Sequence, residues 1–145
     1  WPNVIKESVR VTKPGGWVEF VESDFLVFSD GPILNRLQSW QAKILEKRGI
    51  DSTVVRKMEA FFQDAGLTQV QCTKSIAPIG ITGGQIDELF LKNYLSILGS
   101  MKPFLCAEGE ISSEEFDSLH GQIRKECLEY KSYGAIYVTY GQKPL

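Results

Sequence analysis

The chain has 145 residues, 43% of them hydrophobic, and its 16 basic and 18 acidic side chains leave a formal net charge of −2. Such a chain is long enough to bury the core of one domain. The charges are mixed along it without a run of one sign, which argues against a nucleic-acid or membrane-surface partner. No apolar run approaches the roughly 20 residues of a membrane span, and no secretory signal opens the chain.

Three cysteines, Cys72, Cys106 and Cys127, are odd in number and show no C-x-x-C spacing. We expect them to be reduced and mostly structural, as in a cytoplasmic (intracellular) protein. With one histidine and isolated cysteines, the sequence predicts no metal site. The chain begins at Trp1 without a methionine, so we expect its natural N-terminus to have been trimmed or left out.

The first elements are a helix and a strand joined by a tight turn. Apolar residues at helical spacing predict a helix over residues 3–12. Pro14-Gly15-Gly16 ends it, because proline cannot continue a helix and glycine tolerates positive φ. The residues from Trp17 to Val21 are β-branched and aromatic and predict a strand. That strand is apolar on nearly all positions, so we expect helices on both faces of its sheet.

Two helices and a second strand are predicted next. Ser29-Asp30-Gly31-Pro32 places a capping side chain before a proline, which is typical of a helix start, and Gly49 ends that helix. A further helix is predicted from about Thr53 to Ala65, and a strand through roughly residues 70–76. The buried face of this further helix is expected to consist of Val54, Val55, Met58, Phe61 and Phe62.

The last third of the chain predicts two helices and a closing strand. Gln85 to Leu98 is expected to bury a stripe of Ile86, Leu89, Phe90, Tyr94, Ile97 and Leu98. Ser112 and Glu115 have the spacing of a capping box, which opens a helix that runs to about Tyr130. Ala135 to Tyr140 is predicted as a strand. The whole is therefore an α/β chain, a single domain over residues 1–145 with a helical insertion over about 83–131.

Three segments carry a family resemblance: "VRVTKPGGWVEFVESD", "KMEAFFQDAGLTQVQ" and the closing "AIYVTYGQKP". Together they resemble the C-terminal half of a class I S-adenosylmethionine-dependent methyltransferase, in the fungal LaeA-type branch associated with secondary metabolism. The resemblance implies a Rossmann-like half-fold. Its three-stranded mixed sheet has strands equivalent to the family's fifth, seventh and sixth, in that spatial order, with an inserted helical cap.

The resemblance also implies a departure from the family. The glycine-rich turn and the acidic residue that hold S-adenosylmethionine in the family lie upstream of anything in this chain. The only comparable glycine run, at residues 80–84, follows the second strand and is expected to be a connection. We therefore expect a truncated relative with no cofactor as the chain stands, and S-adenosylmethionine only if an N-terminal half or a partner supplies the site.

The sheet order leaves one edge of the first strand unpaired. In a complete enzyme of the family, the fourth strand covers that edge. An apolar unpaired edge favours pairing with another chain, so we expect a homodimer that associates across the strand from Trp17 to Val21.

Catalytic candidates are Glu22, Asp24, Tyr94 and His120. Alternation places Glu22 and Asp24 on one side of the first strand at its C-terminal end, where ligands bind in open α/β sheets. These two carboxylates either act as a general base or polar anchor for a substrate, or are simply solvated at the end of the strand. Glu19 lies in the middle of the strand and would need a partner if it were buried. His120 shares a helical stripe with Phe116 and is either an acid–base group or a satisfied core histidine.

Aromatic residues are frequent in the helical segments, and the resemblance implies that these segments cover the substrate. An apolar pocket with few polar groups is the usual form of a small-molecule site, although most of these rings must be ordinary core. Tyr94, Tyr130 and Tyr133 are also candidate hydrogen-bond donors to a carbonyl, and Cys106 is a weaker candidate nucleophile. The candidate substrate-binding residues are Phe25, Phe28, Trp40, Tyr94, Met101, Phe104 and Tyr133.

Three functions remain open. The first is a methyltransferase-like cyclase or pericyclase of natural-product biosynthesis, which folds a small apolar metabolite into a reactive conformer without S-adenosylmethionine. The second is a fragment or subunit of a true S-adenosylmethionine-dependent methyltransferase. The third is a non-catalytic module that pairs through the open sheet edge. We therefore lean towards an enzyme.

Overall fold

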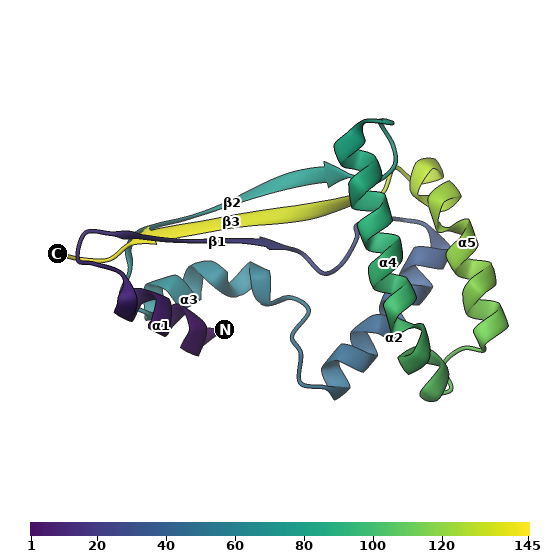
Figure 1. Cartoon of the computed structure of the whole chain (residues 1–145), viewed down its shortest axis with the longest axis horizontal. Helices are drawn as coiled ribbons and strands as arrows, with labels where there is room; N and C mark the ends of the chain where they lie inside the picture. Colours follow the sequence, from purple (N-terminus) through teal and green to yellow (C-terminus); the bar gives the residue numbers. More distant parts are fainter. The chain divides into compact units, whose positions relative to one another are not determined.

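The computed structural model describes residues 1–145, and the contacts divide the chain into two compact units (Figure 1). Unit 1 consists of Trp1–Phe25, Thr53–Ser75 and Ala135–Leu145. Unit 2 consists of Leu26–Ser52 and Ile76–Gly134. The single domain expected from the sequence stays a prediction.

The elements follow one another nearly as the sequence predicts. They are α1 (Pro2–Val11), β1 (Trp17–Ser23), α2 (Pro32–Lys47), the 3₁₀ helix η1 (Val54–Lys57), α3 (Met58–Asp64), β2 (Thr68–Pro78), α4 (Gln85–Ala107), α5 (Ser113–Glu129) and β3 (Tyr133–Gln142). The helix predicted from Thr53 to Ala65 is thus a 3₁₀ turn followed by a short α-helix.

The sheet has the spatial order β1-β3-β2, as predicted. β1 and β3 are antiparallel, with Trp17 opposite Gln142 and Ser23 opposite Ile136. The start of β2 lies beside the end of β3, since the Thr68 hydroxyl donates to the Gln142 carbonyl at 3.1 Å. Both neighbouring pairs are therefore antiparallel, and only the two outer strands, which do not touch, run in the same direction.

The core of unit 1 lies on one face of this sheet, where α1 and α3 pack (Figure 1). Val18 and Phe20 of β1 point towards the helices, and the Phe20 ring meets the Phe62 ring edge to face at 5.5 Å. The alternate residues Trp17 and Val21 are 51% and 58% exposed. The expectation that helices cover both faces of β1 is therefore wrong in unit 1, and one face is open.

Unit 2 contains the helices α2, α4 and α5. α4 extends to Ala107, nine residues beyond the predicted end at Leu98. Its buried positions recur at spacings of four and three: Asp87, Leu91, Tyr94, Leu98, Met101 and Leu105. Ile86, Leu89 and Ile97 were predicted to be buried but are 72%, 57% and 37% exposed. α4 carries apolar residues on all sides, so its sequence did not determine which side is buried.

The helix starts of unit 2 differ in how they are capped. Ser112 accepts the Glu115 backbone N–H at 3.1 Å, as the predicted capping box requires. α2 begins after Gly31 with no side-chain cap of its own. No helix in the structure combines the length and apolar character needed to cross a membrane.

Candidate functional site

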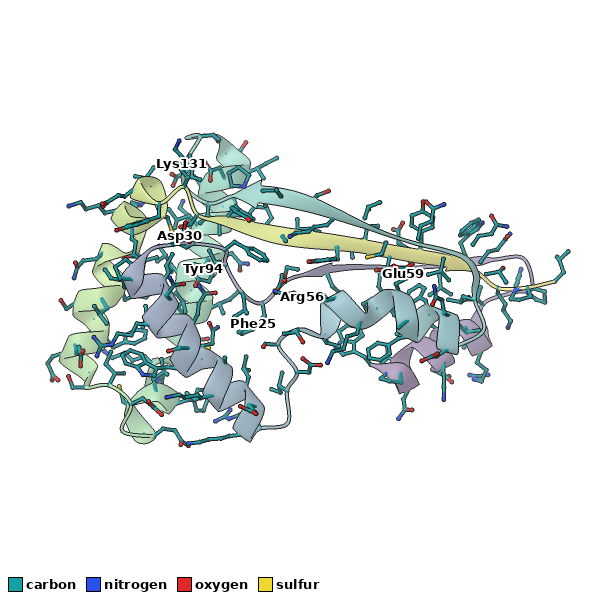
Figure 2. The ribbon with its side chains drawn as sticks, turned by 180° about the vertical axis from the view of Figure 1, so that it is seen from behind. Phe25, Asp30, Arg56, Glu59, Tyr94 and Lys131 are labelled. Atoms are coloured by element: carbon teal, nitrogen blue, oxygen red, sulfur yellow. The ribbon has the colours of Figure 1, made fainter.

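Tyr94 is a buried residue of α4 in unit 2 (Figure 2). It lies close to Cys127 and Glu126 of α5, and these three side chains form a buried polar cluster. The Tyr94 side chain is 7% exposed, and its hydroxyl has no hydrogen-bond partner. Burial raises the pKa of Tyr94, and the nearby Cys127 and Glu126 raise it further. The phenol is therefore neutral at physiological pH and keeps its proton available for donation.

Cys127 of α5 is fully buried beside this phenol. Burial raises its pKa to about 11, although a hydrogen bond from Ser132 acts in the opposite direction. The nucleophile of a cysteine is its thiolate, so Cys127 packs as a neutral thiol. This fits the structural role that we expected for it.

Glu126, the third member of the cluster, contacts the first turn of α2. Its carboxylate accepts the backbone N–H of Ile33 at 3.0 Å and that of Leu34 at 2.6 Å. These N–H groups belong to the first turn of α2, where helices leave donors unpaired and favour a negative charge. Gly31 leaves room for this contact, since a Cβ at that position would lie 2.4 Å from the Glu126 carboxylate, which would then have to shift. The cap that the sequence assigned to residues 29–30 comes instead from α5.

Asp87 binds the glycine run at residues 80–84. One carboxylate oxygen accepts hydrogen bonds from the backbone N–H and hydroxyl of Thr82 and from the Gly83 N–H. Burial acts to raise the pKa of Asp87, but these hydrogen bonds and one from the Gly80 N–H outweigh it, and the pKa is lowered. The loop amides that a nucleotide cradle would need are engaged by Asp87. The run therefore does not fit S-adenosylmethionine.

Several buried polar atoms of unit 2 lack partners. Both polar atoms of the Gln41 amide are unpaired although the side chain is fully buried, and so are the Tyr94 hydroxyl and the second oxygen of Asp87. Nearly all buried polar groups in proteins are hydrogen-bonded to protein or water. Water or a bound molecule can satisfy buried groups of this kind. No pattern in the sequence marked Gln41, because a glutamine on an amphipathic helix is ordinarily solvated.

Phe28 and Tyr133, two of the predicted substrate-binding residues, lie together. Their backbones form a reciprocal antiparallel bridge, and their rings stack at 5.1 Å with an interplanar angle of 10°. Beside this bridge, the Ser132 hydroxyl donates to the Ser29 hydroxyl at 2.8 Å. Both aromatic residues are half-buried.

The other predicted lining residues of unit 2 are divided between its core and its surface. Trp40 and Met101 are 7% and 8% exposed, and the Arg36 guanidinium covers the Trp40 ring at 4.6 Å. Phe104 is 42% exposed under the Arg48 guanidinium, on the outer side of α4.

His120 lies between α4 and α5 but two helical turns away from Cys127. Its Nε2 is 2.9 Å from the Leu95 carbonyl oxygen, and its ring stacks on Phe116 at 5.6 Å. Cys127 is seven positions further along α5, about 10 Å along the helix axis. The structure thus gives His120 a hydrogen-bond partner and does not place it beside the thiol of the polar cluster.

Glu22 and Asp24 belong to unit 1, at the end of β1. The Asp24 side chain is fully buried, and its Oδ2 accepts hydrogen bonds from Arg56 at 2.9 and 3.0 Å. That hydrogen bond raises the pKa of Arg56. Burial acts more weakly in the opposite direction, and Tyr137 raises the pKa as well. Half-buried Glu22 pairs across the sheet with Tyr137. The sequence analysis did not predict Arg56 as a partner of Asp24, although Arg56 lies within the predicted helix. Phe25, the next residue after Asp24, is half-buried.

Comparison with known proteins gives one informative relationship. No protein-family model matches the chain. The chain is similar to "Methyltransferase psoC" from Aspergillus fumigatus, with 23% identity over 145 residues, 97% of this chain and 52% of that protein. The chain thus spans about half the length of the curated relative it matches. The similarity supports a methyltransferase-like relationship, in agreement with the α/β sheet order.

Proposed function

We propose that this chain is the substrate-side part of a methyltransferase-like protein of small-molecule biosynthesis, and that unit 2 binds an apolar metabolite through a carbonyl group. The observation that carries the proposal is the unpartnered hydroxyl of Tyr94 in a buried, apolar setting. An orphaned donor costs free energy in the empty protein, roughly 1–3 kcal/mol, which a substrate acceptor recovers on binding.

The polar groups of the cluster have the chemistry that such a substrate needs. A neutral phenol donates one hydrogen bond, and a substrate carbonyl can accept it. The surrounding side chains of α4 and α5 are apolar, among them Leu91, Leu98 and Ile123. A mostly apolar site with a few polar groups is the usual design of a small-molecule site.

The reaction that we propose is cyclisation of a linear precursor, of the pericyclic type, without S-adenosylmethionine. Such a reaction needs no external reagent, since the bonds that form and break lie within one molecule. Holding the chain in a folded conformer accelerates it by positioning. A hydrogen bond from Tyr94 to a carbonyl conjugated with the reacting double bonds would withdraw electron density and stabilise the transition state.

The second candidate is methyl transfer within a longer or two-chain enzyme of the LaeA-type branch. The similarity to a methyltransferase of about twice this length favours it. In this case the same tyrosine orients the acceptor substrate, and S-adenosylmethionine is held by residues outside this chain. The residues of this chain then bind and position the acceptor only.

The experiment is incubation of the purified chain with a linear polyene ketone, with and without S-adenosylmethionine, followed by chromatography and mass spectrometry. Cyclisation yields an isomer of unchanged mass in both reactions, whereas methyl transfer yields a product heavier by one CH₂ and only with S-adenosylmethionine. Calorimetric titration with S-adenosylmethionine runs in parallel.

The matched variants are Tyr94→Phe and Tyr130→Phe, the latter at a tyrosine that is 39% exposed. The proposal predicts that Tyr94→Phe slows formation of either product about tenfold or more, while Tyr130→Phe retains the wild-type rate. Equal effects of the two variants would contradict the role of Tyr94. A folded chain that neither binds the ketone nor forms a product would instead indicate a non-catalytic interaction module.

A further inference from the structure

The open face of the unit 1 sheet carries a small depression lined by Trp17, Glu19 and Tyr140, with a volume of about 270 Å³. Trp17 and Glu19 are alternate residues of β1, and Tyr140 lies on β3. All three belong to the face that α1 and α3 leave open, and the Trp17 side chain is 51% exposed. No residue of unit 2 contributes to this depression.

The strand register brings these side chains together. The Asp24 N–H donates to the Ala135 carbonyl and the Lys143 N–H to the Gly16 carbonyl, so the even-numbered residues of β1 bond to β3. Glu19 and Tyr140 are therefore a directly opposed pair without hydrogen bonds between them, the arrangement in which cross-strand side chains lie closest. Trp17 is diagonal to Tyr140, and their rings lie 5.8 Å apart at an angle of 58°.

The electrostatics of the depression favour a cation. The Glu19 carboxylate has no ion-pair or hydrogen-bond partner. The ammonium group of nearby Lys143 is occupied by the carbonyls of Val9 and Thr12. The Tyr140 hydroxyl donates to the Gln71 side chain at 2.6 Å, which holds the ring in place. Two aromatic rings and a carboxylate without a partner thus border an open depression, and no basic side chain lines it.

We propose that this depression binds a methylated ammonium group. Aromatic faces attract cations through the ring quadrupole, and tryptophan does so most strongly. Methylation weakens hydration of the cation and gives it apolar surface to place against the rings, while the carboxylate supplies the opposite charge. The group is carried either by a small choline-like molecule or by a trimethylated lysine side chain. This site is independent of the cluster around Tyr94.

The test is an NMR titration of the isotope-labelled 145-residue chain with choline, with the indole resonance of Trp17 identified from Trp17→Leu. The neutral tert-butyl analogue of choline has the same shape without the charge. The proposal predicts saturable shifts of the Trp17 indole with choline and at least about fivefold weaker binding of the neutral analogue.

Two carboxylate variants make the test specific. Glu19→Gln is expected to weaken choline binding about threefold, as for an exposed ion pair. Glu59→Gln, at an exposed position of α3 in the same unit, should leave it unchanged. Both positions are exposed, and circular dichroism verifies that both variants fold. Equal binding of choline and its neutral analogue would overturn the proposal, as would equal effects of the two variants.

A second titration distinguishes the two sources of the ammonium group. A short peptide with one trimethyl-lysine that binds more tightly than choline, and more tightly than the same peptide with unmodified lysine, assigns the site to a protein side chain. A peptide that binds no better than choline assigns it to a small molecule. Absence of any Trp17 shift with either probe would overturn the proposal.

Discussion

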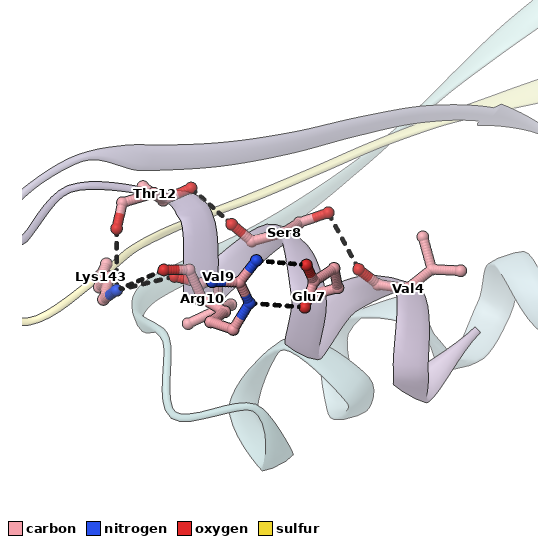
Figure 3. A network of polar contacts seen from close by, with 7 residues as sticks. All are labelled: Val4, Glu7, Ser8, Val9, Arg10, Thr12 and Lys143. Atoms are coloured by element: carbon pink, nitrogen blue, oxygen red, sulfur yellow. Dashed lines mark hydrogen bonds and ion pairs between the residues drawn. The ribbon is translucent and has the colours of Figure 1, made fainter.

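The ammonium group of Lys143 lies 2.8 Å from the carbonyl oxygen of Thr12, at the C-terminal end of α1 (Figure 3). It also binds the Val9 carbonyl at 2.8 Å. Helix ends leave such carbonyls unpaired, and a cation is favoured at this end. The backbone of Lys143 pairs in addition with Gly15 and Gly16. The K-P-G-G-W turn and the Y-G-x-K-P tail are therefore joined to each other.

Replacing this lysine should weaken unit 1. Lys143→Met keeps most of the side-chain volume and removes the charge, and we expect a loss of about 1–2 kcal/mol in the free energy of unfolding. Lys13→Met is the control, since Lys13 is exposed on the same turn, and should change the value by less than about 0.5 kcal/mol. Urea unfolding measures both. Similar values for the two variants would show that the helix cap contributes nothing.

Asp87 should make the stability of the chain sensitive to acid. Its pKa is lowered in the folded state from a reference of 3.8. Its carboxylate therefore stabilises the fold above that reference pH, and the contribution is lost as the pH falls through the lower folded pKa. Asp87→Asn should be less stable than wild type at neutral pH, and the difference should shrink on acidification below about pH 4.

Urea unfolding of the wild type and Asp87→Asn at several pH values measures that difference. Asp64→Asn serves as the control, because Asp64 is exposed at the end of α3. A difference between wild type and Asp87→Asn that stays constant with pH would refute the role of the charged carboxylate.

The three cysteines should react with a thiol reagent in a fixed order. Cys72 and Cys106 are partly exposed, whereas Cys127 is fully buried with its pKa raised to about 11. At pH 8, iodoacetamide should modify the first two, and Cys127 only after unfolding in urea. Peptide mass spectrometry identifies the modified residues. Early modification of Cys127 would show that the polar cluster opens in the native protein.

The free edge of β1 should mediate self-association, as we propose from the sheet order. Because the even-numbered residues bond to β3, the N–H and C=O groups of Trp17, Glu19, Val21 and Ser23 face the unpaired edge. Light scattering at micromolar concentration should give the mass of a dimer. Val21→Lys places a charge on that exposed strand and should shift the mass towards a monomer. A monomeric wild-type chain would contradict the proposal.

Local sequence signals predicted the sheet and most helix bounds. The glycine turn before Trp17 and the capping box at Ser112 are short-range patterns, and the structure retains both of them. The sheet order came from the family resemblance, and the observed order agrees with it. Which faces are buried was predicted less well, because α4 is apolar all round and its neighbours select the buried side.

The site depended on contacts that no local pattern encodes. Glu126 lies 93 residues from Ile33, and Arg56 lies 32 residues from Asp24. Neither pair has a sequence spacing that reveals it, since each pair is brought together only by folding. Tyr94 was one of three tyrosines named from the sequence as candidate donors, and the absence of a partner for its hydroxyl is visible only in the structure.

The most direct measurement is the free energy of unfolding of the ligand-free chain and of its Tyr94→Phe variant. If the Tyr94 hydroxyl is unpaired until a substrate binds, the variant lacks a buried unsatisfied donor. The variant should then be more stable than the wild type by about 1–2 kcal/mol. Tyr130→Phe should change little. A Tyr94→Phe variant that is less stable than wild type by a similar amount would mean that the hydroxyl already has a structural partner, and the proposed substrate site would be contradicted.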